Sequence, residues 1–279
     1  MPTEMIYGRN HFDTEAAKQR CADLRRRVLE LSQRVSALHI GGAFSCTEMI
    51  DCIFNGLMRD PHNPAQGDTF IISKGHSAII QYVILESLGV LTSDDIAGYC
   101  TPNGILGVHP DIGNPGIAAS TGALGHGLAM SVGMALADKN TGADRRMYVL
   151  LSDGELQEGS TWEAALFAPS KGLTNLIMFI DANDMQGLDR PSLAMPNLYP
   201  IGAKFEQFGW EAAEVDGHDS GAIFDAVTSR KGDRPFVLVG HSVKGKGVSF
   251  MEHVAMWHYR SPSPDEYLKA LDEIAESLK

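Results

Sequence analysis

The chain has 279 residues, of which 44% are hydrophobic and 21% are charged, as is ordinary for a globular protein. Its formal net charge is −12 with no basic block, which argues against extended contact with nucleic-acid phosphates. No apolar run approaches the roughly 20 residues of a membrane span, and the first residues lack the apolar region of a signal peptide. We therefore expect a cytoplasmic protein that binds neither nucleic acid nor membrane.

The first half of the chain contains amphipathic and apolar segments typical of helices. Apolar residues spaced three and four apart predict a helix over 14–38, and a second helix is expected over 45–58. The arginine run at 25–27 lies on the first of these helices and is expected to form a solvated face. A short strand at 69–72 then precedes a helix that begins near Ser77.

The second half alternates between helical and apolar segments. Residues 99–122 are rich in Gly, Pro and Thr and predict a long connection, which precedes a small-residue helix at 124–139. Three continuous apolar runs are expected to be strands: 147–151, 175–180 and 235–241. This alternation predicts an α/β fold, a parallel sheet with helices on both faces. We expect a single domain over 1–279, with an N-terminal extension at 1–13 and a C-terminal helical tail at 263–279.

The four cysteines carry no signal of metal or disulfide chemistry. Cys21, Cys46, Cys52 and Cys100 fit neither a CxxC metal pattern nor a disulfide framework. Free cysteine is readily buried as a small hydrophobic residue, so we expect reduced, structural thiols.

Polar residues follow two of the predicted strands at a separation of 30 residues. Asp153 and Gly154 come after the strand that ends at Ser152, and Asn183 follows the next strand. One β-α-β crossover takes roughly 30 residues, so both side chains should reach the carboxyl edge of one sheet, where ligands bind. Carboxylate and amide oxygens suit Mg²⁺ or Ca²⁺, and a glycine before a helix suits a phosphate. These residues are also ordinary turn formers, and this pair alone leaves both readings open.

The surrounding segment resembles the thiamine diphosphate signature Gly-Asp-Gly followed some thirty residues later by Asn, with Ser152 in place of the first glycine. "SDGELQEG" is most similar to the form found in transketolases. Further segments resemble motifs of that family in the same order: "LHIGGAFSCTEM" at 38–49, "ISKGHSAIIQY" at 72–82, "GVHPD" at 107–111, "STGALGHGLAMSVGMALA" at 120–137, and "VKGKGVSFME" followed by "WHY" at 243–259. The resemblance implies the thiamine diphosphate-binding fold and covers about residues 14–262.

The resemblance also implies roles for individual residues. Asp153, Asn183 and the carbonyl of Met185 would bind Mg²⁺, for which Ca²⁺ or Mn²⁺ could substitute. A larger set would contact thiamine diphosphate: His76, Gly122, Ala123, Leu124, Gly154, Asn183, Lys244 and His258. Four histidines fall in family motifs and would act on the polyol substrate, with His76 and His258 also near the cofactor: His39, His76, His109 and His258.

Three further positions are left open. Glu158 corresponds to a family glutamate at the subunit contact, but it could equally be an ordinary first-turn helix residue favoured by the helix dipole. His126 replaces a residue that is often glutamine in the family and is read as a packing or helix-start residue. Tyr259 stands where the family usually has glycine after Trp-His, so the substrate-facing loop could differ here.

A complete transketolase is several hundred residues longer, so the chain resembles the N-terminal subunit of a split transketolase. Such an enzyme transfers a two-carbon ketol unit from a ketose or ketose phosphate to an aldose or aldose phosphate. In the family, the glutamate that activates the aminopyrimidine belongs to the other domain. We therefore expect a heterotetramer with a separate C-terminal partner subunit, and no activity of this chain alone. The alternatives are a 2-oxo acid dehydrogenase E1 alpha-like subunit or a non-catalytic cofactor-binding module.

Overall fold

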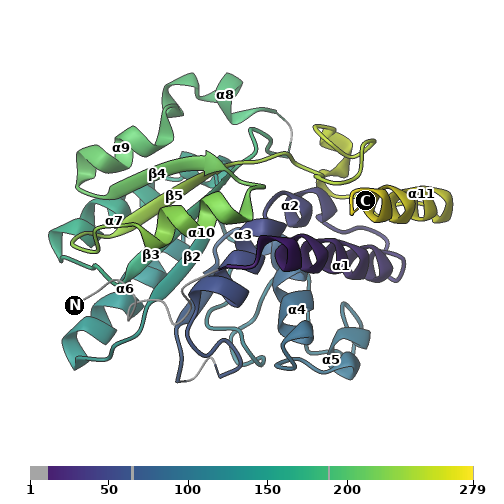
Figure 1. Cartoon of the computed structure of the whole chain (residues 1–279), viewed down its shortest axis with the longest axis horizontal. Coiled ribbons are helices and arrows are strands. Elements are labelled where there is room, and N and C mark those ends of the chain that lie inside the picture. The colour runs from purple at the N-terminus through teal and green to yellow at the C-terminus, as the bar shows by residue number, and fades with distance from the viewer. Residues whose placement is uncertain (1–11, 64–65, 188, 279) are drawn as a thin grey trace.

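The computed structural model describes residues 12–63, 66–187 and 189–278, so nearly all of the predicted N-terminal extension lies outside the described residues. Its centre is a five-stranded sheet in which every pairing is parallel (Figure 1). The order of the strands is β1-β2-β3-β5-β4. They span Thr69–Ile72 (β1), Met147–Ser152 (β2), Leu176–Ala182 (β3), Glu211–Asp216 (β4) and Phe236–His241 (β5).

The α-helices of the described residues surround this sheet. They are α1 (Thr14–Ser32), α2 (Ile40–Ser45), α3 (Thr47–Cys52), α4 (Ala78–Ser87), α5 (Ser93–Ala97), α6 (Gly127–Thr141), α7 (Gly159–Ser170), α8 (Pro191–Ala194), α9 (Ile201–Phe208), α10 (Ser220–Thr228) and α11 (Pro264–Glu276). Near the C-terminal end of the chain, α11 lies alongside α1 and buries Ala270 and Ile274 (Figure 1).

The strands are apolar throughout the centre of the sheet because both of its faces are covered. Along β3, Ile177 and Phe179 pack into one core, while Met178 and Ile180 pack into the other. The first core includes residues of α1, α3, α4 and α10, and the second includes residues of α6, α7 and α9. Successive side chains of a strand point to opposite faces, so a strand buried on both sides needs apolar residues at consecutive positions. The predicted α/β architecture with helices on both faces is confirmed.

The three apolar strands were predicted within two residues, whereas β4 was missed. Its sequence, EAAEVD, is polar, and its residues are only partly buried or exposed because the strand lies at the edge of the sheet. The segment 99–122 is a long connection, as expected, and contains no helix or regular strand among the described residues.

Two predicted helices differ from the structure. The first ends at Ser32 rather than at residue 38, with Gln33 as its C-cap. The helix expected over 45–58 is shorter: α3 ends at Cys52, and a π-helical turn covers 53–57. The helix α2, which ends at Ser45, precedes it and was not predicted. Periodicity marks the apolar face correctly, but it does not report where local hydrogen bonding changes from one turn type to another.

The arginine run is not a uniformly solvated face. Arg25 is only 6% exposed, and its guanidinium forms a two-point ion pair with Glu48, so the prediction was wrong for this residue. Arg26 and Arg27 remain partly exposed and pair with Asp23 and Glu30, respectively.

The prediction of free thiols buried as small hydrophobic residues holds for three of the four cysteines and is wrong for Cys100, which is exposed. All four cysteines are free: Cys21, Cys46 and Cys52 are buried, and Cys100 is exposed.

Within the described residues, no helix is both long enough and apolar enough to cross a membrane.

The second core predicts a measurable stability effect. Trp210 is fully buried, packs edge-on against Phe205, and donates from Nε1 to the carbonyl of Ala165 at 2.7 Å. We expect Trp210→Ala to lower the free energy of unfolding by about 3–5 kcal/mol, because it leaves a large cavity and an unpaired carbonyl. Leu166→Ala is the control, since Leu166 is 55% exposed and should change the free energy by less than about 0.5 kcal/mol. Urea denaturation followed by circular dichroism measures both, and equal losses would contradict the assignment.

Candidate active site

The carboxyl ends of β2 and β3 bring Asp153 and Asn183 to one edge of the sheet. The two strands are neighbours, and Ser152 is in register with Asp181. Asp153 is 1% exposed and Asn183 is 6% exposed. One carboxylate oxygen of Asp153 accepts from the amide of Gly154 at 2.8 Å, and the other accepts from the amide of Asp184 at 2.6 Å. The expectation that one crossover places these residues together is confirmed.

Asp153 has no cationic partner among the described residues, although it is buried. Burial raises the pKa of its carboxyl group to about 7, and the nearby negative charge of Asp181 adds to this effect. A buried carboxylate without a counter-charge is unfavourable, so this position fits a bound cation. No group of three His, Cys, Asp or Glu side chains in the described part of the chain could hold a metal. A cation here would instead meet mixed carboxylate, amide and carbonyl oxygens, which suits Mg²⁺ or Ca²⁺.

A buried ion pair fixes the orientation of Asn183. Lys74 and Asp181 are both at most 1% exposed, and the lysine Nζ lies 2.5 Å from Oδ2 of the aspartate. The same Oδ2 accepts from Nδ2 of Asn183 at 3.0 Å, which leaves the amide oxygen of Asn183 turned toward the loop that follows β3. That oxygen accepts from the amide of Met185. Burial alone would raise the pKa of Asp181, but the Lys74 charge, together with hydrogen bonds from Lys74, Ser242 and Ser45, lowers it below its ordinary value and keeps the carboxylate ionised.

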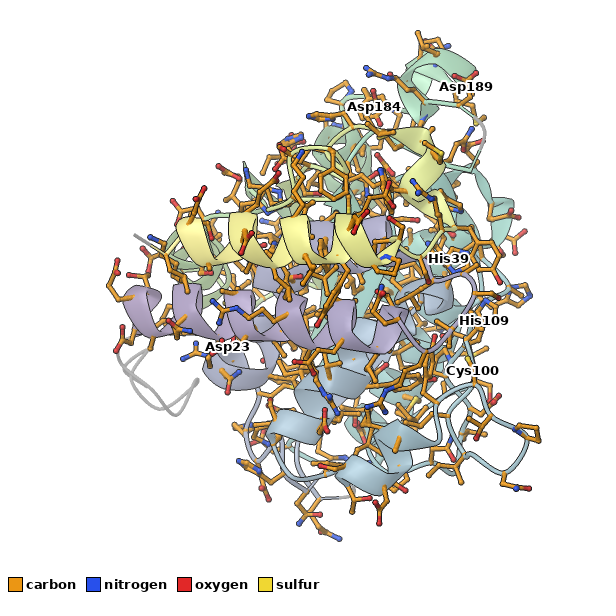
Figure 2. All side chains as sticks on the ribbon, turned by 90° about the vertical axis from the view of Figure 1, so that its right-hand side faces the viewer. Asp23, His39, Cys100, His109, Asp184 and Asp189 are labelled. Atoms are coloured by element: carbon orange, nitrogen blue, oxygen red, sulfur yellow. The ribbon has the colours of Figure 1, made fainter. Side chains whose placement is uncertain are left out.

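Most of the predicted site residues line one cavity of about 230 Å³ beside this edge. Those that line it are His39, His76, Gly122, Leu124, Gly154, Asn183, Met185, Lys244 and His258. Asp153 is buried next to Gly154, while Ala123 and His109 are exposed and do not contribute to the lining. In Figure 2, His39 and His109 lie along the same side of the molecule.

The predicted loop over 99–122 approaches the cavity through Gly122. This glycine has φ +135°, and a Cβ atom on it would lie 2.4 Å from Cδ2 of His109. Only glycine fits this backbone conformation and this close approach. His109 therefore packs against the cavity wall from outside, adjacent to the position predicted to contact a cofactor.

Three imidazoles cluster in the cavity. The ring centroids of His39 and His76 lie 5.1 Å apart, those of His39 and His258 lie 5.2 Å apart, and those of His76 and His258 lie 5.7 Å apart. Nζ of Lys244 lies 2.7 Å from Nδ1 of His258 and 3.1 Å from the carbonyl oxygen of Met185. An ammonium group only donates, so Nδ1 of His258 is the acceptor and its Nε2 carries the hydrogen.

The cluster is electrostatically biased toward neutral rings. Burial, reinforced by neighbouring cationic groups, lowers the pKa of both His39 and His258 to about 4. Burial also lowers the pKa of His76 well below its usual value. Nδ1 of His39 is buried and has no hydrogen-bond partner. Neutral imidazoles both donate and accept, so the cluster suits a ligand with several hydroxyl groups.

None of the three residues left open by the sequence lines this cavity. Glu158 is exposed and is the N-cap of α7, where its side chain makes no capping hydrogen bond. His126 is the exposed N-cap of α6, and its Nδ1 lies 3.0 Å from the carbonyl oxygen of Leu124. The Tyr259 side chain is 54% exposed, and its ring centroid lies 4.5 Å from that of His39. The structure thus places Tyr259 beside a predicted substrate residue.

Sequence reasoning missed the buried groups that support the site. Lys74 stands within the segment "ISKGHSAIIQY" and Asp181 stands two residues before Asn183, but their pairing spans 107 residues and has no local signal. Glu155 is also fully buried; its Oε1 accepts from Ser73 at 2.5 Å and from the amide of Gly125 at 2.9 Å. The one sequence signal for Glu155 is its position directly after Asp153-Gly154.

The neutral histidines predict a titration behaviour. The pKa values of His39 and His258 lie below the 6.5 of an ordinary histidine, so the folded chain binds these protons less tightly than the unfolded chain. The free energy of unfolding should therefore fall as the pH is lowered from 6.5 toward 4. We expect NMR titration of the ring protons to show both imidazoles neutral above about pH 5.5. His39→Gln and His258→Gln assign the signals, and titration of either ring above pH 6 would contradict the analysis.

Sequence comparison identifies relatives over nearly the whole chain. The family described as "Transketolase, thiamine diphosphate binding domain" matches residues 17–267. The chain is 36% identical over 260 residues to a subunit of apulose-4-phosphate transketolase of Phocaeicola vulgatus, covering 91% of this chain and 92% of the relative. It is 33% identical to the 6-deoxy-6-sulfo-D-fructose transketolase subunit SqwG of a Clostridium species, covering 90% and 93%.

Longer relatives match over part of their length. Human transketolase is 32% identical over 249 residues, which is 88% of this chain and 40% of the human protein. The crystal structure of transketolase from Campylobacter jejuni superposes with a TM-score of 0.86 at 25% identity, covering 93% of this chain and 43% of that one. The parallel sheet, the cavity at its carboxyl edge and the match over 17–267 agree, and the chain belongs to the transketolase family as its thiamine diphosphate-binding domain.

Proposed function

We propose that this chain is the cofactor-binding subunit of a two-chain transketolase that moves a two-carbon ketol unit from a ketose to an aldose. The observation that carries the proposal is the match to relatives named as transketolase subunits, which extends over more than nine tenths of their length and of this chain alike. The cavity at the carboxyl edge of the sheet supports it, because one cavity combines a position for a cation with neutral imidazoles.

We assign the cation site to Asp153, Asn183 and the carbonyl oxygen of Met185, with Mg²⁺ as the metal. The unpaired carboxylate supplies the charge, and the Lys74–Asp181 pair holds the amide of Asn183 in one orientation. Support for this set lies in the chemistry of its oxygens, which are those Mg²⁺ prefers. The Mg²⁺ would offset the negative charge of a diphosphate held in the same cavity.

The diphosphate would lie between Gly154 and Lys244. Gly154 carries no side chain that could block the approach of a phosphate to the backbone. Burial lowers the pKa of Lys244 to about 8, so its ammonium is still mostly protonated at pH 7 and can pair with the anion. His76 and His258 would contact the cofactor from another wall of the cavity, with the backbone of 122–124 beside it.

The sides of the histidine rings that do not contact the cofactor would face the sugar. Thiamine diphosphate, when bound, accepts the electron pair of the ketose bond that breaks. The neutral rings of His39, His76 and His258 orient the hydroxyl groups and exchange protons with them, and His109 extends this surface along the neighbouring loop. Their depressed basicity keeps them unprotonated at neutral pH, so they can accept as well as donate.

A separate chain would supply the rest of the enzyme. This chain spans only about two fifths of human transketolase, and several of its relatives are named as transketolase subunits. In transketolases, which the chain resembles, the glutamate that activates the aminopyrimidine belongs to the other domain. We therefore assign it to a C-terminal partner subunit, in a heterotetramer of two of each chain.

The cation site predicts the behaviour of an isosteric variant. Asp153→Asn keeps the shape of the side chain but removes its charge, so we expect the affinity for thiamine diphosphate in the presence of Mg²⁺ to fall at least about tenfold. Isothermal titration calorimetry of the chain together with its partner measures this change. Asp189→Asn is the control, because Asp189 is exposed and lies on the loop after β3 that also carries Asn183 and Met185 (Figure 2). Equal affinities of the two variants would contradict the metal assignment.

The two-chain arrangement predicts where activity arises. We expect no ketol transfer from a panel of ketoses and ketose phosphates by this chain alone, and transfer when the chain carrying the remaining transketolase domains is added. Chromatographic analysis of the sugar products measures it. Transfer by the purified single chain would overturn the subunit proposal, and a cofactor-loaded complex that processes pyruvate but no ketose would overturn the reaction class.

A further inference from the structure

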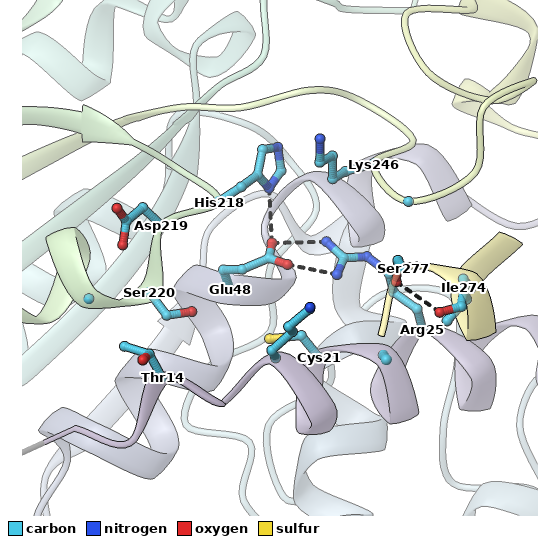
Figure 3. A pocket seen from close by; sticks show the side chains of 14 residues that line it. Thr14, Cys21, Arg25, Glu48, His218, Asp219, Ser220, Lys246, Ile274 and Ser277 are labelled. Carbon is cyan, nitrogen blue, oxygen red and sulfur yellow. Dashed lines mark hydrogen bonds and ion pairs between the residues drawn. The ribbon is translucent and has the colours of Figure 1, made fainter. Parts of the chain in front are cut away.

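A buried chain of hydrogen bonds leads from α1 to the segment that carries Lys244, outside the cavity of the proposed active site. Arg25 donates to both carboxylate oxygens of Glu48, at 2.7 and 2.9 Å. Nδ1 of His218 lies 2.9 Å from Oε2 of the same glutamate, and Figure 3 shows that carboxylate between the guanidinium and the imidazole. The other ring nitrogen of His218 accepts from the backbone amide of Val243 at 2.8 Å.

The geometry fixes the tautomer of His218. The amide of Val243 can only donate, so Nε2 of His218 carries no hydrogen. The single ring hydrogen of the neutral imidazole is therefore on Nδ1, and it is donated to Glu48. Both nitrogens are used, which makes the ring a bridge between a buried carboxylate and a backbone amide.

The carboxylate end of this bridge is held rigidly. Glu48 is 8% exposed and Arg25 is 6% exposed. Burial alone would raise the pKa of Glu48, but Arg25 and the hydrogen bond from His218 bring it down to about 2. Nη2 of Arg25 also donates to the carbonyl oxygen of Phe44, in the last turn of α2, at 2.9 Å. The anchor therefore joins α1, α2 and α3.

The same helix α2 contacts the Lys244 segment directly. Its first residues follow His39, and the carbonyl oxygen of Gly41 accepts from the amide of Gly245 at 3.0 Å. A Cβ atom on Gly41 would lie 3.2 Å from Cγ of Lys244, so helix and segment are in close contact. The segment 243–245 is thus held at two points: the amide of Val243 by His218 and the amide of Gly245 by α2.

Lys244 lies between these two points, and its side chain is the one of this segment that enters the proposed active site. Its Nζ reaches the carbonyl oxygen of Met185 and Nδ1 of His258, both in the proposed active site. His218 lies on the turn after β4 and lines a different cavity, of about 420 Å³, to which neither Met185 nor His258 contributes. A displacement of the Val243 amide would therefore move the next residue, Lys244.

We propose that His218 is a positioning residue for Lys244: by accepting the hydrogen bond of the Val243 amide, it sets the place of the lysine relative to α2 and His39. Its effect on cofactor binding rests on the proposed function, whereas its effect on the Val243 amide does not. The competing explanation is that His218 serves only to satisfy the buried carboxylate of Glu48.

Two substitutions separate these explanations. The amide group of asparagine occupies the place of Nδ1 of histidine, so His218→Asn keeps a donor to Glu48 and loses the acceptor for Val243. The amide group of glutamine reaches the place of Nε2, so His218→Gln keeps an acceptor for Val243 and loses the donor to Glu48. His241→Asn is the control, because His241 also pairs with a glutamate, Glu214, but its side chain is 55% exposed.

Hydrogen–deuterium exchange of the full chain tests the first step. We expect exchange of the Val243 amide to become about tenfold faster in His218→Asn and to stay within about threefold of the unaltered chain in His218→Gln and His241→Asn, because the loss of one hydrogen bond lowers local protection. Thermal unfolding of each variant verifies that it is folded. Normal Val243 protection in His218→Asn, or loss of protection in His218→Gln alone, would overturn the proposal in favour of the purely structural role.

Cofactor binding tests the second step. With the partner chain and Mg²⁺ present, His218→Asn should bind thiamine diphosphate about tenfold more weakly than His218→Gln, while the KM values of the two variants for the sugar stay alike once cofactor is saturating. Faster Val243 exchange with unchanged cofactor affinity would overturn the link to Lys244. If the unaltered complex binds no thiamine diphosphate, the proposed function fails, and the exchange measurement still decides whether His218 holds the Val243 amide.

Discussion

The site depends on two carboxylates that the parallel sheet brings to the ends of neighbouring strands. Asp181 and Asp153 are both buried, and a buried negative charge is unfavourable unless a positive charge offsets it. Lys74 offsets the charge of Asp181, whereas no cationic side chain of the described residues pairs with Asp153. Asp181 is therefore a structural anchor, whereas Asp153 is suited to a metal ion, although the two aspartates stand only one crossover apart.

The anchor and the proposed metal position are coupled through Asn183. Its amide nitrogen is bound to the carboxylate that Lys74 neutralises, so its oxygen has one available direction. A metal site needs ligands held in place before the metal arrives, and buried partners behind the ligands provide this. The contact between Lys74 and the carbonyl oxygen of Gly42 extends the same support to α2, the helix that begins next to His39. The proposed metal position and the histidine cluster therefore share the same buried support.

The histidine cluster owes its chemistry to burial. Three imidazoles within 6 Å of one another, close to the Lys244 and Lys74 ammonium groups, cannot all be protonated without strong repulsion. They remain neutral, and Lys244 determines which nitrogen of His258 carries the hydrogen. Lys244 itself is held by backbone contacts from two sides, one of which passes through His218 and the buried Glu48. The neutral imidazoles are thus held in place by buried groups whose charges are compensated.

The local sequence was sufficient to predict the elements whose environment is uniform. The three central strands are buried on both faces, so their apolar runs mark them directly, and the 30-residue spacing alone places Asp153 and Asn183 at one edge. The helix ends at Ser32 and Ser45 were not predicted, because apolar periodicity continues where hydrogen bonding changes. The edge strand β4 was missed because half-exposed residues carry no apolar signal.

The α/β class, the family resemblance and most of the residues that line the cavity follow from local sequence alone. The packing of the folded chain sets which charges are compensated: Lys74 pairs with Asp181, Arg25 is buried against Glu48 rather than solvated, and His218 bridges Glu48 to Val243. These contacts join residues between 23 and 170 positions apart. Pairings over such distances depend on how the helices pack on the sheet, and a local pattern of residue types contains no information about that packing.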